Sequence, residues 1–182
     1  MDLYLVAFLL PPAASQPVWA LKQEVHRLTG SRNAIRLPPH LTLLPPLRRP
    51  PEFDGELRQL LAAFAAETPA CPVALRNFAW FQDRTLYVCV EPDTGLQQLH
   101  HRFYQLCARE LPAVPLPTRP FVPHVTLATR DLPPDQVPAL RALFAPRSFA
   151  ADIVLNELVL FRHTGQQWEA EARFYLPATP VK

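Results

Sequence analysis

The sequence PHLTL at residues 39–43 returns as PHVTL at residues 123–127. Alternate side chains of an extended strand point to the same face, so each copy places its histidine and threonine on one face and its aliphatic side chains on the other. His40 and Thr42 are then separated by two residue rises, roughly 6.6 Å, as are His124 and Thr126. If the two strands lie side by side, two imidazoles and two hydroxyls line one pocket.

Chance does not readily explain this repeat. The chain has 6 histidines, and with ten threonines among 182 residues the composition alone predicts less than one His-x-Thr sequence. Both copies also follow a proline and carry aliphatic residues on either side of the threonine. Two strands with incidental polar residues are the alternative interpretation, and the shared context favours a paired site.

The composition is typical of a globular protein. Of 182 residues, 49% are hydrophobic and 19% are charged, and this length suffices for one sizeable domain or two small lobes. The net charge of +2 is too small for a protein that wraps long nucleic acid, because such proteins carry a dense basic stripe. A local pocket for one or a few phosphates is compatible with it.

Signals for cofactors and targeting are sparse. Cys71, Cys89 and Cys107 are widely spaced and form no Cys-x-x-Cys pair, so neither a disulfide framework nor a zinc site is indicated. The apolar run at residues 3–10 is too short to span a bilayer and precedes two prolines, which favours a strand. We therefore expect a cytoplasmic protein with no membrane segment, no cofactor and no obligate protein partner.

Hydrophobic periodicity and proline pairs predict eleven elements. The expected strands cover residues 3–10, 40–44, 71–81, 85–90, 124–129, 149–161 and 167–176, with a turn at residues 82–84. The expected helices cover residues 17–28, 52–66, 95–110 and 134–144. On the first helix, Leu21, Val25 and Leu28 are spaced to form its buried face. Each half thus reads as strand, helix, motif strand, helix and strands, which predicts one α+β domain over residues 1–182 with two lobes and the motif strands at the cleft between them.

Two imidazoles and two hydroxyls suit the opening of a strained phosphodiester such as a 2′,3′-cyclic phosphate. One histidine can take a proton from the attacking water while the other gives a proton to the leaving oxygen, because imidazole titrates near neutral pH. The threonine hydroxyls can donate to the non-bridging oxygens, where negative charge develops. Neither motif contains Asp or Glu, so we expect no metal. The near-symmetric motifs do not reveal which histidine is the acid.

The paired motifs resemble those of the 2H phosphoesterase superfamily, which is named for them. Within it the chain is most similar to the LigT-like RNA 2′,3′-cyclic phosphodiesterases, also called 2′-5′ RNA ligases, and to a bacterial branch named only as phosphoesterases. The shared sequence is PPHLTL at residues 38–43 and FVPHVT at residues 121–126, together with Leu160, Trp168 and the FYL at residues 174–176. The resemblance covers most of the chain in order and spacing.

This resemblance implies a bilobal fold with pseudo-twofold symmetry and a central groove. It implies that His40 is the proton donor to the leaving oxygen and His124 the proton acceptor from water, with Thr42 and Thr126 binding the phosphate. The implied reaction hydrolyses 2′,3′-cyclic phosphates at RNA 3′ ends or on small nucleotides to 2′-phosphomonoesters. No metal is implied.

One arginine departs from the family's pattern. Many LigT-like proteins carry arginine directly after His-x-Thr-Leu-Ala, whereas here Thr129 occupies that place and Arg130 follows. A shift of one residue in a strand moves a side chain to the opposite face. Arg130 is therefore a candidate phosphate ligand only if the strand has already ended.

Other residues near the motifs are candidates for substrate binding. Arg36 and Arg119 precede the two histidines by four and five residues and could attract phosphates at the mouth of the groove, or be solvated loop residues. Phe121, and with less support Trp80 and Phe81, could stack on a base. Core packing is the alternative for all three aromatic residues.

Two other functions are also compatible with the sequence. The same chemistry could act on another small cyclic phosphate, such as an ADP-ribose derivative. The chain could instead be a non-catalytic module that binds RNA ends or nucleotides. Binding alone would not need two proton-transfer groups, so the two histidines favour an enzyme.

Overall fold

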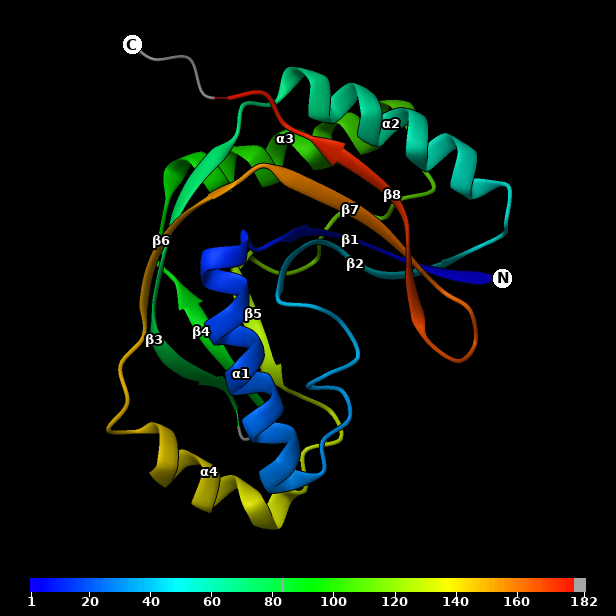
Figure 1. Ribbon diagram of the computed structural model, residues 1–182. Coiled ribbons are helices and arrows are strands. Elements are labelled where there is room, and N and C mark those ends of the chain that lie inside the picture. Colours follow the sequence, from blue (N-terminus) through cyan, green and yellow to red (C-terminus); the bar gives the residue numbers. More distant parts are fainter. Residues whose placement is uncertain (83, 179–182) are drawn as a thin grey trace.

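Two four-stranded antiparallel sheets and the helices that pack on them form an α+β fold (Figure 1). The computed structural model describes residues 1–82 and 84–178. The first sheet has the order β2 (His40–Arg49), β1 (Asp2–Leu9), β7 (Glu157–His163), β8 (Trp168–Tyr175). The second has the order β5 (His124–Ala128), β4 (Thr85–Val90), β3 (Cys71–Phe81), β6 (Ala150–Leu155). The helices are α1 (Pro12–Thr29), α2 (Phe53–Glu67), α3 (Thr94–Glu110) and α4 (Val137–Phe144), the last preceded by the 3₁₀ turn η1 (Pro134–Gln136).

The two halves repeat one another, which confirms the bilobal prediction. The succession β1-α1-β2 in the first half corresponds to β4-α3-β5 in the second, and each motif strand lies at the edge of its sheet. The lobes do not coincide with the halves, however. Strand β3 of the first half pairs with β4, and β7 of the second half pairs with β1. The first half therefore supplies β3 to the second sheet, and the second half supplies β7 and β8 to the first.

The motif strands show the alternation that the sequence predicts. Leu41 and Leu43 are each 1% exposed, while Val125 and Leu127 are fully buried. The histidine and threonine of each motif are half-buried on the opposite face. Burial of each aliphatic side chain stabilises the fold and fixes the register of the strand, because a slip of one residue would turn these side chains to solvent.

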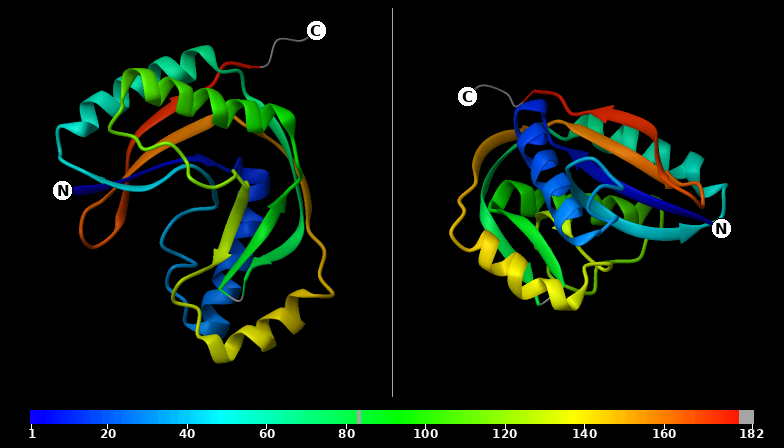
Figure 2. Two further views of the ribbon diagram at one scale, coloured as in Figure 1. Left: turned by 180° about the vertical axis from the view of Figure 1, so that it is seen from behind. Right: turned by 60° about the horizontal axis from the view of Figure 1, so that its bottom comes forward.

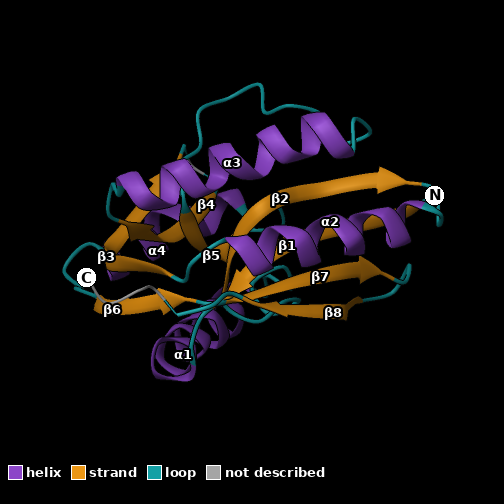
Figure 3. Cartoon of the chain, turned by 90° about the horizontal axis from the view of Figure 1, so that it is seen from above, coloured by secondary structure: helices purple, strands orange, loops and turns teal. Residues whose placement is uncertain are grey.

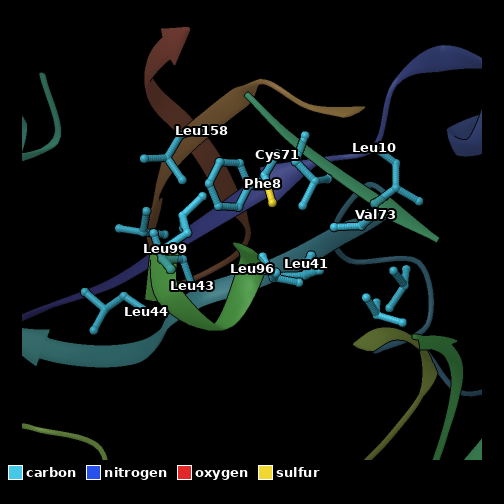
Figure 4. Close-up of a cluster of buried hydrophobic side chains, with 14 of the residues drawn as sticks. Phe8, Leu10, Leu41, Leu43, Leu44, Cys71, Val73, Leu96, Leu99 and Leu158 are labelled. Carbon is cyan, nitrogen blue, oxygen red and sulfur yellow. The ribbon is translucent and has the colours of Figure 1, made fainter. Parts of the chain in front are cut away.

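The larger of the hydrophobic clusters formed by the described residues lies behind both lobes. Figure 4 shows Leu41 and Leu43 of β2 in the same cluster as Phe8 of β1 and as Leu96 and Leu99 of α3. Helix α3 follows β4 in the second half of the sequence, so the core under the first motif strand is completed by the other half. The two lobes therefore depend on each other for burial of apolar surface.

The helices lie on two sides of the sheets. Helices α2 and α3 contact each other and lie together on one side of the first sheet, whereas α1 lies on the other side and contacts β5 (Figures 2 and 3). Among the described residues, no helix is both long enough and apolar enough to cross a membrane.

Prolines interrupt fewer elements than the sequence predicts. Helix α1 begins at Pro12 rather than at residue 17, and contains the exposed Pro17. Strand β2 continues to Arg49 through two exposed prolines, Pro45 and Pro46. These prolines lie on an edge strand at a bulge, where Tyr4 and Val6 of β1 pair with Leu47 and Leu44. A proline without an N–H is tolerated at such a place because no ladder hydrogen bond is lost.

The predicted strand at residues 149–161 is wrong as a single element. It consists of β6 and β7, which are separated at Asn156 and belong to different sheets. A run of apolar residues does not reveal where a chain passes from one sheet to the next. The predicted bounds of β3 and β4 match the structure. Asp83, in the turn expected between them, lies outside the described residues.

We expect Leu43→Ala to lower the free energy of unfolding by about 2–5 kcal/mol, because it leaves a cavity in the shared core. Hydrogen exchange should show both sheets losing protection together. Leu116→Ala is the matched control, since Leu116 is 61% exposed and its truncation should change stability by less than about 0.5 kcal/mol. Separate unfolding of the two sheets would contradict the shared core.

Candidate active site

The two His-x-Thr motifs meet where the sheets approach each other. Strands β2 and β5 are edge strands of different sheets and contact one another. His40 and His124 are the first residues of these strands, and the charge of His124 acts on the pKa of His40. The structure therefore brings together the four residues on which the sequence prediction depends.

Each histidine is held by its own hydrogen bond, of the same kind in both motifs. Nδ1 of His40 donates to the carbonyl oxygen of Pro38 at 2.7 Å, and Nδ1 of His124 donates to the carbonyl oxygen of Val122 at 2.8 Å. A carbonyl oxygen can only accept, so Nδ1 carries the proton and Nε2 of the neutral ring keeps its lone pair. The intervening prolines are buried and restrict the backbone that presents each carbonyl.

The environment keeps both rings uncharged at neutral pH. Burial, together with the nearby charges of Lys22 and His124, lowers the pKa of His40 to about 4, against the opposing hydrogen bond from His40 to Pro38. Burial also lowers the pKa of His124 below its ordinary value. In the unliganded protein each Nε2 is therefore a proton acceptor, and a negatively charged ligand would raise both pKa values.

The two threonines are available to a ligand. Thr42 and Thr126 share the faces of His40 and His124, and both are half-buried. Neither hydroxyl makes a hydrogen bond within the described part of the chain. A hydroxyl that no protein group satisfies can donate to a phosphate oxygen.

The charge of Lys22 acts on His40, and no sequence pattern had singled out this lysine. Its side chain is 2% exposed and belongs to the buried face of α1, with Val18 and Val25. The prediction for the buried face of this helix was wrong in part, because Leu28 is 53% exposed. The signal was a lysine four residues after Val18 and three before Val25, positions that share one face of a helix.

Aromatic side chains surround His124. Its ring lies 4.8 Å from that of Phe81 and 5.3 Å from that of Tyr87, measured between centroids, and these two aromatic rings stack at 4.2 Å. Phe121 stacks instead on His100, with centroids 3.8 Å apart, so one of its faces is covered. Phe81 thus lies at the site, while Phe121 packs on α3.

Trp80 faces away from the histidines. It precedes Phe81 in β3, so its side chain points to the opposite face of the strand, where the guanidinium of Arg141 lies 4.7 Å from its ring. It lines a cavity of about 520 Å³ with Phe78 and Phe144, among others. No residue of either motif lines this cavity, so it is separate from the candidate site.

The three candidate arginines lie on loops. Arg36, Arg119 and Arg130 are exposed and make no hydrogen bond or ion pair with a described residue. Strand β5 ends at Ala128, so the rule of alternating faces does not reach Arg130, whose φ of 34° is left-handed. Their contact with a substrate stays a prediction.

Asp131 links the loops that flank the two motifs. Its carboxylate accepts hydrogen bonds from the Ser31 hydroxyl at 2.6 Å and from the backbone N–H groups of Arg32 and Asn33 at 2.8 and 3.0 Å. Burial opposes ionisation, but these hydrogen bonds outweigh it and lower the pKa of Asp131. The loop before β2 is therefore fastened to the loop after β5.

Potential metal ligands are dispersed over the part of the chain that the structure describes. Residues 1–82 and 84–178 contain no group of three or more His, Cys, Asp or Glu side chains that could hold a metal ion. Cys71, Cys89 and Cys107 are all free thiols.

A known protein family matches most of this chain. The family model described as the 2′-5′ RNA ligase superfamily matches residues 10–167. The chain belongs to this superfamily. The matched range spans both motifs and the positions of Lys22 and Asp131.

Bacterial proteins are similar to the chain in sequence. A Geobacillus kaustophilus protein named "Putative phosphoesterase" is 35% identical over 100 residues, 53% of this chain and 54% of that protein. The chain thus spans about half the length of this curated relative. An Oceanobacillus iheyensis protein of the same name is 28% identical, over 77% of this chain and 81% of its own.

Two crystal structures share the fold. The Thermus thermophilus protein TT0787 has a TM-score of 0.72 and 24% identity, with 99% of this chain and 100% of that chain covered. Apo LigT of E. coli has a TM-score of 0.62 and 19% identity, with 97% and 98% covered. The expected LigT-like fold is therefore confirmed.

We expect Asp131→Asn to lower the free energy of unfolding by about 1–3 kcal/mol, because an amide nitrogen cannot accept the N–H and O–H bonds. In the unchanged protein, this contribution should be present above the ordinary pKa of 3.8 and fade as the pH falls through the lowered pKa. Chemical denaturation at several pH values measures both. Asp135→Asn, at an exposed position nearby, is the control, and equal stability of the two variants would refute the link.

Proposed function

We propose that this chain is a phosphoesterase that hydrolyses 2′,3′-cyclic phosphates at RNA or nucleotide ends to 2′-phosphomonoesters. The observation that carries the proposal is the pair of contacting strands, each with a threonine and a histidine fixed through Nδ1. The superfamily and the names of the bacterial relatives support phosphoesterase chemistry.

The reaction needs one proton removed and one supplied. Nε2 of one histidine takes the proton of the attacking water, and a P–O bond forms as the bond from phosphorus to the 3′ oxygen breaks. Nε2–H of the other histidine protonates that 3′ oxygen. Thr42 and Thr126 donate to the two non-bridging oxygens and stabilise their increasing negative charge.

The resemblance assigns proton donation to His40 and acceptance to His124. Because His40 is neutral in the free protein at pH 7, it must gain its proton when the anionic substrate binds. The negative charge of the phosphodiester favours this by raising the pKa of the neighbouring imidazoles. The acid–base pair thus forms at the site only when substrate is present.

Nucleotides bind to a protein that shares this fold. Crystal structures record E. coli LigT in complex with 3′-AMP, NADP⁺ and ATP. A nucleotide bound here would have the rings of Phe81 and Tyr87 beside the phosphate site. Arg36, Arg119, Phe121 and Arg130 remain proposed substrate contacts outside this core. An ADP-ribose cyclic phosphate would use the same chemistry, and comparison of its turnover with that of nucleoside cyclic phosphates separates the two substrates.

We expect His40→Ala and His124→Ala each to reduce kcat/KM on a nucleoside 2′,3′-cyclic phosphate by about 10²–10⁴-fold, because each removes a proton-transfer group. Activity should survive EDTA. His101→Ala removes an exposed imidazole and should leave kcat/KM unchanged. Tight binding of the cyclic phosphate with no turnover by the unchanged protein would identify a binding module instead.

The pH dependence of kcat/KM should reach its maximum on the acid side of neutrality. Productive encounter needs a single proton on the pair of rings, and this state is most populated between the pKa of about 4 at His40 and that of His124, which lies below 6.5. In the free protein this proton lies mainly on His124, so the bound anion must favour its transfer to His40 before His40 acts as the donor. Above that range kcat/KM should fall about tenfold per pH unit as the last proton leaves. Initial rates at low substrate from about pH 4 to about pH 9 measure this, and a maximum above about pH 7.5 would contradict the lowered pKa values.

A further inference from the structure

Lys22 is a buried cation with no counter-ion among the described residues. Its ammonium makes no hydrogen bond or ion pair with any described residue, and it lies 6.0 Å from the centroid of the Trp19 ring. The side chain lies between Val18 and Val25 on the buried face of α1, the helix that contacts motif strand β5. Burial of an unpaired charge is strongly destabilising unless another group compensates it.

Lys22 interacts electrostatically with a histidine of the first motif. The charge of Lys22 acts on His40, and that of His124 acts on the same ring, so the ammonium lies within the electrostatic reach of the site. Burial lowers the pKa of Lys22 to about 8, and the side chain therefore remains mostly charged at pH 7. No acidic side chain of the described residues pairs with it.

We propose that Lys22 is a third phosphate-binding group of this site, whose ammonium pairs with a non-bridging phosphate oxygen beside Thr42 and Thr126. The bound phosphate supplies a counter-ion that none of the described residues provides. In the reaction, the ammonium balances the second negative charge that the phosphorus centre gains when water adds. This last step rests on the proposed function, whereas phosphate binding itself does not.

Lys22 is better suited to this role than the loop arginines. Arg36, Arg119 and Arg130 are exposed, where water and salt weaken a charge–charge interaction. Lys22 is almost completely buried, so its attraction for an anion is much less screened. A buried cation also loses little side-chain entropy on binding, because its rotamer is already fixed by packing.

The composition of the chain allows a direct test in the unchanged protein. There are only two lysines, Lys22 and Lys182, so selective ¹⁵N,¹³C labelling of lysine gives two sets of side-chain NMR signals. Titration with inorganic phosphate at pH 7 and constant ionic strength should shift the Lys22 signals saturably and slow the exchange of its ammonium protons. Lys182 should not respond, and chloride should not replace phosphate.

Paired variants provide the second test. Lys22→Met removes the charge at similar volume, and Arg27→Met removes a charge from the exposed side of the same helix. Lys22→Met should raise the melting temperature in phosphate-free buffer, lose the phosphate-dependent rise in melting temperature, and lower kcat/KM by about tenfold to a hundredfold. Arg27→Met should match the unchanged protein in all three measurements.

The outcomes separate this inference from the proposed function. A Lys22 response to phosphate in a protein that does not hydrolyse cyclic phosphates would support the binding group and refute the reaction. Hydrolysis with Lys22 signals that ignore saturating phosphate would support the reaction and refute the binding group. If phosphate shifts neither the NMR signals of Lys22 nor those of His40 and His124, the proposed phosphate-binding role of Lys22 is also refuted.

Discussion

The contact between two edge strands, β2 and β5, is the constraint on which the site depends. Each strand belongs to a different sheet, so nothing in the hydrogen-bond ladders alone holds them together. Three other features do: the exchange of β3 and β7 between the lobes, the core that Leu41 and Leu43 share with α3, and the bonds from residues 31–33 to Asp131. Their common effect is to fix two imidazoles relative to each other.

The chemistry of the site comes from its environment as much as from its residue types. Imidazoles in water would be partly protonated near neutrality, whereas burial keeps both rings neutral here. In each ring, the hydrogen bond that Nδ1 donates leaves Nε2 as a proton acceptor. Such a site is arranged to gain a proton together with an anionic ligand, and the proposed pairing of that ligand with the ammonium of Lys22 would add to its affinity.

The repeat was sufficient to predict the motif strands, their alternating burial and their association, because a period of two residues determines which side chains share a face. It could not show that β6 and β7 enter different sheets, since Asn156 lies in an apolar run like any strand interior. Pro45 and Pro46 suggested that β2 ends before them. The strand continues because these prolines lie at a bulge on the edge of the sheet. Asp131 acts through hydrogen bonds to residues 31–33, and the charge of Lys22 acts on His40. Local spacing does not reveal such long-range relations.

The most direct test of the account is a crystal structure with a nucleoside 2′-phosphate bound. We expect the phosphate between β2 and β5, with Nε2 of His40 and Nε2 of His124 each about 3 Å from a phosphate or 3′ oxygen. A phosphate that contacts only one of the two rings, or that binds elsewhere on the molecule, would contradict the claim that both histidines act on one phosphorus centre.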